Sequence, residues 1–558
     1  MCHNEERQSS ADGGTEGYRR TAERDGTSTA VPGSLIAVSN RQPYRHEYAD
    51  DDSSESSDSG GQATVDGGTT GGPSLVADTN GDDERPITVD RPTGGLTAGL
   101  DPVLRRSGGT WIAWGDGDAD RDVTGDDGCV QVPPEDEEGA YTLQRVWLSD
   151  EAVDAYYRGF SNRVLWPLCH GFPDIVEYRP NDLEWYRAVN RQFADAVADH
   201  ATDDAVVWLQ DYHFGLAPAM IRESVPRSVT IAQFWHIPWP APAVFHRCPA
   251  RRELLEGLLG NDLLGFHVDR YCEHFLECVD AFVPGAIVDS RRRVVHYRGR
   301  EIRIVATPMG VDAAAYDQQS RSIDVTRWDD VRENHGIPKG NAIGLGVDRL
   351  DYTKGIPERL AAVERFFERN PAWRGEFTFV QKSMPSRTEI PTYQRHGEYV
   401  RSEVDRINAR FEQDGWRPIV YVEEYLPRAD LCALYRRADV MVVSPLVDGM
   451  NLVAQEYVAA SVDGDGSLVL SSTVGAHETL GEFVYTIEPR RREEFATTIE
   501  AALTAPPSER RRRMDGLRRR VFERDLESWM HAQFGELRRL HEAGHSANRN
   551  RSRRPRST

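Results

Sequence analysis

The feature that most constrains the fold is a repeated alternation of short apolar runs with amphipathic segments. The apolar runs lie at 34–40, 205–212, 228–237, 342–350, 377–383, 418–425, 440–446 and 467–473. Segments with apolar residues at helical spacing lie at 357–370, 429–438 and 452–461. Continuously apolar strands that alternate with amphipathic helices are typical of parallel sheets covered by helices on both faces. The sequence therefore predicts an α/β fold.

The apolar runs form two series, one before and one after about residue 312. A chain of 558 residues has room for two or three domains of about 100–200 residues each. We therefore expect an N-terminal domain at 34–312 and a C-terminal domain at 313–505, both doubly wound and facing each other across a cleft. Ligands of such domains bind at the carboxyl ends of the strands.

The remaining segments are strongly polar. We expect a disordered tail at 1–33, a C-terminal helix at 506–541 that packs back on the N-terminal domain, and a disordered basic tail at 542–558. We also expect an acidic low-complexity insertion at 46–90 that lies in solvent, although modulation of domain closure is an alternative role for it.

The formal net charge is −23, which argues against nucleic acid or an anionic membrane as the main partner. Among the 67 basic residues only Lys339, Lys354 and Lys382 are lysines. Excess carboxylate with little lysine favours a salt-rich, halophilic cytoplasm. A GC-rich genome would also explain the loss of lysine, but it would not explain the excess of acid.

The seven cysteines form no CxxC pair, which favours a reduced compartment. The sequence contains no apolar stretch of about 18 residues and no signal-peptide pattern. We therefore expect a cytoplasmic protein without a membrane partner.

Two turns in the second half carry the strongest chemistry. Arg349 and Lys354 follow an apolar run and are five residues apart, so both cations can reach one anion, such as a diphosphate leaving group. In 444–458 a strand gives way to a helix whose first amides can receive a phosphate. Asp448 can accept hydrogen bonds from sugar hydroxyls, and Glu456 is placed to reach a ribose diol.

The first half offers weaker signals. The glycine pair in 93–96 can expose amides to an anion, although an ordinary turn fits it equally well. Asp211 and His236 follow apolar runs, and a structural role fits either residue alone. The aromatic run 156–167 can form a wall against which a sugar stacks, or it can simply pack in the core.

Together and in this order, these motifs resemble the trehalose-6-phosphate synthases, a family of retaining glycosyltransferases. The motifs are SNR, GGL, YYxxFSNxxLWP, DYH, HIPxP, RLDYxKG, PSR and DGMNLVAxEYV, and the likeness runs from about Ser34 to about His541. The resemblance implies the GT-B arrangement, in which two Rossmann-like domains hold a nucleotide-sugar donor and glucose 6-phosphate. It implies transfer of glucose from a nucleoside-diphosphate glucose, UDP-glucose above all, to give trehalose 6-phosphate.

The resemblance also implies a set of site residues. The implied catalytic residues are Arg349, Lys354, His236 and Asp448. The implied donor-binding residues are Gly94, Gly95, Met450, Asn451, Leu452, Val453 and Glu456. The implied acceptor-binding residues are Arg41, Trp114, Tyr157, Trp166, Asp211 and Arg387.

Residue chemistry agrees with a retaining transfer that relies on positioning and charge. The sequence shows no carboxylate pair with glycosidase spacing, and none is needed if the leaving phosphate takes the acceptor proton. Arg349 and Lys354 would neutralise the departing diphosphate, so we expect neither a metal nor another cofactor.

Some alternatives stay open. A related enzyme of the family would transfer glucose to glycerol 3-phosphate, and a non-catalytic homologue would only sense sugar phosphates. Gln210 and Asp348 depart from the family pattern, which has His and Glu there. The sequence leaves open the donor base and the oligomeric state, including a homo-oligomer, and we expect the trehalose-phosphate phosphatase to be a separate chain.

Overall fold

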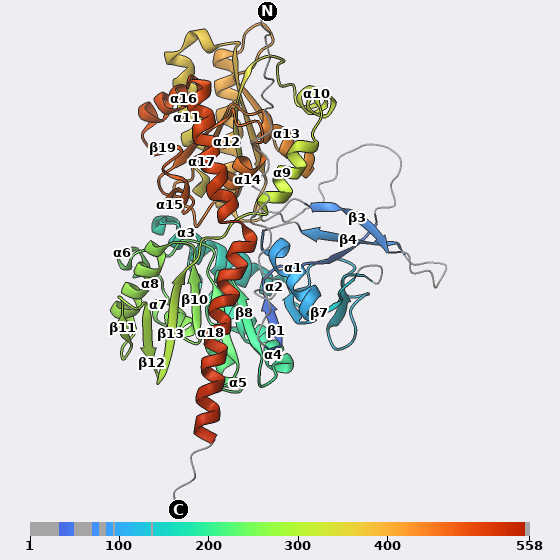
Figure 1. Ribbon diagram of the computed structural model, residues 1–558, viewed down its shortest axis with the longest axis vertical. Coiled ribbons are helices and arrows are strands. Elements are labelled where there is room, and N and C mark those ends of the chain that lie inside the picture. The colour runs from blue at the N-terminus through green and yellow to red at the C-terminus, as the bar shows by residue number, and fades with distance from the viewer. Residues whose placement is uncertain (1–32, 50–69, 77–84, 93–94, 135–137, 553–558) are drawn as a thin grey trace, which may run out of the picture.

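The computed structural model describes residues 33–49, 70–76, 85–92, 95–134 and 138–552. It has two lobes, one above the other in Figure 1, and each lobe is built around its own sheet. Most neighbouring strands are parallel, which confirms the predicted α/β fold.

The sheet of the N-terminal lobe has ten strands in the order β11-β12-β13-β10-β9-β8-β1-β5-β7-β6. Only β12 and β6 run antiparallel to their neighbours. The strands are β1 Leu35–Val38, β5 Thr110–Trp114, β6 Cys129–Val132, β7 Tyr141–Val146, β8 Val206–Gln210, β9 Thr230–Phe234, β10 Leu263–Phe266, β11 Ile287–Asp289, β12 Val294–Tyr297 and β13 Arg300–Ala306.

The sheet of the C-terminal lobe has six parallel strands in the order β16-β15-β14-β17-β18-β19. The strands are β14 Ala342–Arg349, β15 Phe377–Met384, β16 Ile419–Val422, β17 Val440–Val443, β18 Ser467–Ser471 and β19 Tyr485–Ile487. In chain order this is the 3-2-1-4-5-6 arrangement of a Rossmann sheet, whose topological switch point lies between its first and fourth strands. Ligands are therefore expected at the carboxyl ends of β14 and β17.

Helices cover both faces of each sheet, because the apolar strands must be buried on both sides. The helices of the N-terminal lobe are α1 Gly95–Ser107, α2 Asp150–Ala152, α3 Trp166–Cys169, α4 Pro180–His200, α5 Ala217–Ser224, α6 Pro242–Phe245, α7 Arg251–Leu258 and α8 Asp269–Phe282. Those of the C-terminal lobe are α9 Ala313–Ser322, α10 Val325–Asn334, α11 Ile356–Arg369, α12 Pro391–Phe411, α13 Arg428–Arg437, α14 Leu452–Ala460, α15 His477–Leu480 and α16 Arg492–Leu503.

A π-helix, η2 Val153–Leu165, contains most of the aromatic run that the sequence singled out. Its end shows the wide turn of this helix type, because the Trp166 amide donates to the Ser161 carbonyl five residues earlier. Turns of this kind often occur at functional sites. Short 3₁₀ helices lie at Pro173–Ile175, Tyr212–Phe214, Tyr352–Lys354 and Pro371–Trp373.

The C-terminal segment joins the two lobes. Helix α17, Pro507–Glu523, packs on the C-terminal lobe, and α18, Leu526–Ser552, runs down the N-terminal lobe (Figure 1). The ring centres of Trp529 and Phe534 of α18 lie 5.6 and 5.4 Å from the ring centre of Trp208 on β8. The segment thus differs from the single helix expected at 506–541: it is two helices, and the second extends into the predicted tail at 542–558.

The acidic insertion also differs from expectation at its ends. Strand β2 Arg45–Tyr48 pairs with β4 Ile87–Pro92, which also pairs with β3 Thr70–Val76. His46 and Val89 are buried, so these ends do not hang in solvent. The predicted tail at 1–33, except Gly33, and much of the insertion lie outside the described residues.

None of the helices in the described part of the chain has both the length and the apolar character of a membrane span.

Candidate active site

The first turn of the site follows β14 and is held by Asp351. Its Oδ1 accepts hydrogen bonds from the Thr353 amide, at 3.0 Å, and from the Thr353 hydroxyl, at 2.9 Å. Gly355 then adopts a φ of +63°, and a Cβ there would lie 2.1 Å from the Ser444 carbonyl oxygen of the neighbouring turn. The chain can therefore turn sharply into α11 only at glycine. This turn fixes Arg349 and Lys354 at the switch point of the sheet.

The second turn follows β17 and leads into α14. Asn451 caps this helix with a φ of +71°, and its side-chain oxygen accepts from the Ala454 amide at 3.2 Å. Its side-chain nitrogen donates to Asp448 Oδ2 at 3.0 Å. The amides of Leu452 and Val453 lie in the first turn of α14, where a helix lacks internal acceptors for its N–H groups. The turn thus presents donors suited to a phosphate.

An ion pair joins the two turns. Lys354 Nζ lies 2.7 Å from Asp448 Oδ2, and both side chains are mostly buried. Burial alone would raise the pKa of Asp448, but the neighbouring Lys354 outweighs it and lowers the pKa. Burial would likewise raise the pKa of Asp351, but Arg387, Arg349 and Lys354 lower it to about 2. Both carboxylates are therefore ionised at neutral pH, and three cations surround Asp351.

The N-terminal lobe supplies Asp211 and His236. The Asp211 carboxylate accepts from the backbone amides of Tyr212 and His236, at 2.9 and 3.1 Å, and its backbone has a φ of +73°. Burial raises the pKa of Asp211 to about 7, although these amides and Arg387 oppose the rise. Burial and the nearby His267 lower the pKa of His236, whose Nε2 lies 3.0 Å from Gln210 Oε1. His236 is thus neutral at pH 7.

The two lobes touch closely at His236. A Cβ on Gly449 would lie 2.3 Å from the His236 carbonyl oxygen. Tyr271 of α8 donates its hydroxyl hydrogen to the Asp448 carbonyl at 2.9 Å. These contacts bring the turn after β17 against the end of β9.

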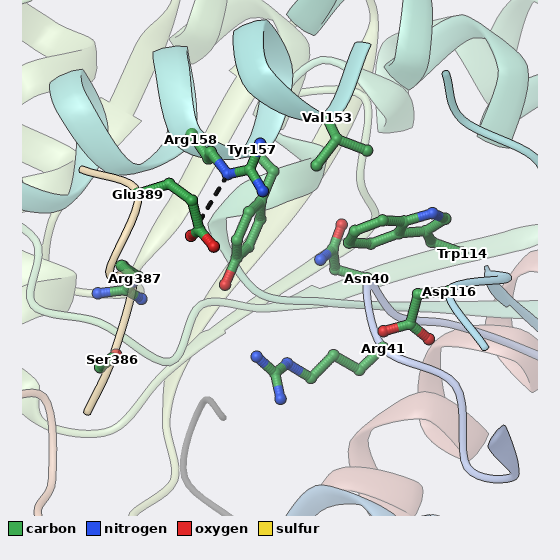
Figure 2. A pocket seen from close by; sticks show the side chains of 10 residues that line it. All are labelled: Asn40, Arg41, Trp114, Asp116, Val153, Tyr157, Arg158, Ser386, Arg387 and Glu389. Atoms are coloured by element: carbon green, nitrogen blue, oxygen red, sulfur yellow. Dashed lines mark ion pairs between the residues drawn. The ribbon is translucent and has the colours of Figure 1, made fainter. Parts of the chain in front are cut away.

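A cavity lined by residues of both lobes lies between them (Figure 2). Its wall contains four of the implied acceptor residues, Arg41, Trp114, Tyr157 and Arg387. The other lining residues are Asn40, Asp116, Val153, Arg158, Ser386 and Glu389.

Arginines converge on Tyr157 in this cavity. Burial would raise the pKa of Tyr157, but Arg41 and Arg387, which also hydrogen-bond its hydroxyl, lower it. Arg387 further donates to the Tyr393 hydroxyl at 2.7 Å, and its Nη1 lies 3.3 Å from Asp351 Oδ2. The cavity therefore has a cationic wall with hydroxyl groups, which suits a phosphate ester.

Trp166 connects this cavity with the first turn. The guanidinium carbon of Arg387 lies 4.1 Å from the centre of the Trp166 ring, and that of Arg349 lies 5.5 Å from it. Arg349 is buried, and burial with the neighbouring Arg387 lowers its pKa to about 10, so it stays charged at neutral pH.

The other implied residues are placed as follows. Glu456 lies one turn into α14, where its Oε2 accepts from the Tyr435 hydroxyl at 2.9 Å, and burial raises its pKa. Met450 is buried in the turn before α14. Gly95 begins α1, and Gly94 lies outside the described residues. The Glu456 carboxylate is hydrogen-bonded by the hydroxyls of Tyr435 and Tyr316.

Sequence reasoning missed several residues of the site. Asp351 stands between Arg349 and Lys354 in the same turn, and that position was the available signal. Tyr393 lies on α12, and the His170 ring packs against that of Trp166, tilted by 32° with ring centres 4.2 Å apart; burial lowers the pKa of His170 to about 4. No local pattern marks the last two. The described residues contain no group of three His, Cys, Asp or Glu side chains arranged to hold a metal.

Comparison with known proteins identifies the family. The family model of glycosyltransferase family 20 matches residues 71–539. The chain belongs to glycosyltransferase family 20. Among curated members, the trehalose-6-phosphate synthase of Mycobacterium avium (strain 104) is 41% identical over 450 residues, which cover 79% of this chain and 88% of that protein. That of Mycolicibacterium smegmatis is 39% identical over 464 residues, covering 82% and 89%.

Solved structures agree. A trehalose-6-phosphate synthase structure from E. coli, bound with UDP-2-fluoro glucose, has a TM-score of 0.75 at 29% identity and covers 90% of this chain and 98% of that chain. The UDP-forming alpha,alpha-trehalose-phosphate synthase of Burkholderia xenovorans, in complex with glucose-6-phosphate, has a TM-score of 0.73 at 29% identity, covering 91% and 100%. This chain therefore has the GT-B fold of the family, as the sequence predicted.

Proposed function

We propose that this chain is a trehalose-6-phosphate synthase that transfers glucose, with retention, from UDP-glucose to glucose 6-phosphate. Its family membership and the names of its relatives support this activity. The observation that carries it is the shared Trp166 ring, which has the acceptor-side Arg387 and the donor-side Arg349 packed against it. Phosphate-binding groups for both substrates thus meet at one point between the lobes.

The residues divide into three roles in this proposal. Arg349, Lys354 and the first amides of α14 bind the diphosphate, and Glu456 binds the ribose. Asp448 and His236 hold the transferred glucose. Arg41, Tyr157, Trp166 and Arg387 bind the acceptor phosphate, while Trp114 and Asp211 face the acceptor sugar. The domain at 34–312 then carries most of the acceptor site and the domain at 313–505 most of the donor site, while Arg387 and His236 each reach in from the opposite lobe.

The reaction needs no separate base. The bond from the glucosyl carbon to the diphosphate breaks as the acceptor hydroxyl attacks from the same face. The leaving phosphate takes the hydroxyl proton, and the two cations stabilise its charge. We propose that the reaction requires no metal.

The setting of the enzyme is also part of the proposal. The scarcity of lysine and the acid excess support work in a salt-rich cytoplasm, where the product leads to an osmolyte. A separate phosphatase would then release trehalose.

A donor-by-acceptor activity matrix tests the function. The purified chain is given UDP-, GDP- or ADP-glucose with glucose 6-phosphate or glycerol 3-phosphate, at low and high KCl, and nucleoside diphosphate release is measured. We expect the fastest release with UDP-glucose and glucose 6-phosphate, and activity that persists at high KCl. Faster nucleoside diphosphate release with glycerol 3-phosphate, or no release with any donor–acceptor pair, would contradict the proposal. The curated relatives, which are named trehalose-6-phosphate synthases, favour neither of these outcomes.

A further inference from the structure

An ion pair between the lobes lies at the wall of the acceptor cavity. Arg158 Nε of η2 lies 3.6 Å from Glu389 Oε2, which follows β15 in the C-terminal lobe. Both side chains line the cavity, and each is about a quarter exposed, at 27% and 25%. Figure 2 shows this pair, Arg41 and Arg387 on different sides of the Tyr157 hydroxyl.

The π-helix explains why Arg158 joins the wall. The hydrogen bonds of a π-helix span five residues, so a residue and those four and five positions later lie one turn apart on the same side of the helix. Val153, Tyr157 and Arg158 have this spacing, and all three line the cavity. An α-helix would place Arg158 further round, away from Val153.

The charge of the acceptor calls for a third cation. A phosphate monoester carries about −1.5 to −2 charges at pH 7 and offers three acceptor oxygens. Arg387 already shares its charge with Asp351, 3.3 Å away. Asp116 adds a further carboxylate to the wall, although Gln42 donates to it at 2.8 Å. Arg41 and Arg387 alone therefore leave part of the phosphate charge unbalanced.

We propose that Arg158 is a third phosphate-binding arginine of the acceptor site, and that Glu389 is its counter-ion while the site is empty. The proposal rests on the proposed function, since the phosphate is that of glucose 6-phosphate. When the acceptor enters, the Arg158 guanidinium exchanges the Glu389 carboxylate for phosphate oxygens. Glu389 thus competes with the substrate for Arg158.

The geometry favours this exchange. At 3.6 Å the distance between the two groups is longer than a hydrogen bond, and solvent reaches both of them. Arg158 therefore loses little interaction free energy when it leaves Glu389. A guanidinium can form two parallel hydrogen bonds to a phosphate, which are stronger. Because the pair bridges the lobes, the exchange also makes acceptor binding sensitive to their relative position.

The test compares three variants of the full chain. Arg158→Gln removes the cation and Glu389→Gln removes its competitor. Arg191→Gln is the matched control, because Arg191 forms a similar ion pair, 3.3 Å from Glu223, on the surface of the same lobe. Steady-state KM and kcat are measured for glucose 6-phosphate and UDP-glucose. The dissociation constant of glucose 6-phosphate is measured by calorimetry with UDP present.

We expect Arg158→Gln to raise the KM and the dissociation constant for glucose 6-phosphate about tenfold, the usual effect of losing a charged hydrogen bond. Its kcat and its KM for UDP-glucose should stay within twofold of wild type. Glu389→Gln should lower the acceptor KM, by up to about fivefold, as expected from an exposed ion pair. Arg191→Gln should change neither value.

A pH profile separates binding from a structural effect. The acceptor phosphate loses its second proton near a pKa of about 6, so wild-type affinity should rise between pH 5 and 7, and Arg158→Gln should show a smaller rise. Arg158→Lys, which keeps the charge, should recover part of the affinity and serves if Arg158→Gln does not fold.

Several results would overturn the proposal: an unchanged acceptor KM in Arg158→Gln, equal losses for both substrates, or a raised acceptor KM in Glu389→Gln. If wild type binds glucose 6-phosphate but releases no UDP, the proposed function fails, while the calorimetric comparison still decides the role of Arg158.

Discussion

The donor side and the acceptor side of the site are built differently. On the donor side, Lys354, Asp448 and Asn451 come from two turns of one sheet and bind each other directly. On the acceptor side, Arg41 and Tyr157 come from one lobe and Arg387 from the other, around a cavity. The two donor turns are therefore held to each other within one lobe, whereas the acceptor side exists only while the lobes stay in contact.

The largest expected effect concerns the donor side. Lys354→Ala should lower kcat by about 10²–10³, as loss of a preorganised charge stabiliser does. Lys339→Ala, which removes an exposed lysine of the same lobe, is the control. Initial rates at saturating substrates measure the effect, and an unchanged kcat would show that the cation does not act on the leaving group.

The next largest effect is expected from disturbing the contact between the lobes. Gly449→Ala places a methyl carbon 2.3 Å from the His236 carbonyl oxygen, which is closer than two non-bonded atoms can approach, so the lobes must separate. We expect kcat/KM to fall about 10²-fold, because a shift of about 1 Å in a reacting pair has that effect. Gly535→Ala, in α18 with open space around it, should leave kcat/KM unchanged. Equal activity of the two variants would refute the claim that closure builds the acceptor side.

A substitution of Arg387 tests whether acceptor binding can be weakened without affecting donor binding. Arg387→Gln should raise the KM for glucose 6-phosphate about 10- to 100-fold, since charged hydrogen bonds to phosphate are lost. The KM for UDP-glucose should change little if the donor side is independent. Arg395→Gln, exposed on α12, is the control. If both KM values rise together, the sides are not separable.

The smallest effect concerns the stability of the donor lobe. Hydrogen bonds from Arg406 and Arg410, together with Arg492 3.0 Å away, outweigh burial and lower the pKa of Glu364 to about 2. Glu364→Gln should reduce the free energy of unfolding at pH 7 by about 1–3 kcal/mol without changing the acceptor KM. Denaturant unfolding measures this loss.

The pH dependence of that loss has a definite sign. A carboxyl whose pKa is lowered on folding stabilises the protein above its ordinary pKa of 4.5, and the contribution disappears as the pH falls towards 2. The difference between wild type and Glu364→Gln should therefore shrink over that range. The exposed Glu398→Gln should show no such difference, and a constant gap would contradict the assignment.

The apolar runs and the short motifs that follow them predicted the fold and the two donor turns more fully than the acceptor cavity. The apolar runs at 342–350 and 440–446 became β14 and β17, and their spacing to Arg349, Lys354 and Asp448 is short. Arg158 and Glu389 are far apart in the chain, and only the π-helix and the contact between the lobes bring them together. The ends of the acidic insertion were misjudged because composition averages over the few buried positions, such as Val89.

The most direct test of the central claim is a crystal structure of the enzyme with UDP and trehalose 6-phosphate. We expect Lys354 Nζ and the Arg349 guanidinium within about 3 Å of diphosphate oxygens, as in other charge-assisted hydrogen bonds to phosphate. A structure in which the diphosphate contacts neither cation would contradict the claim that these two side chains stabilise the leaving group.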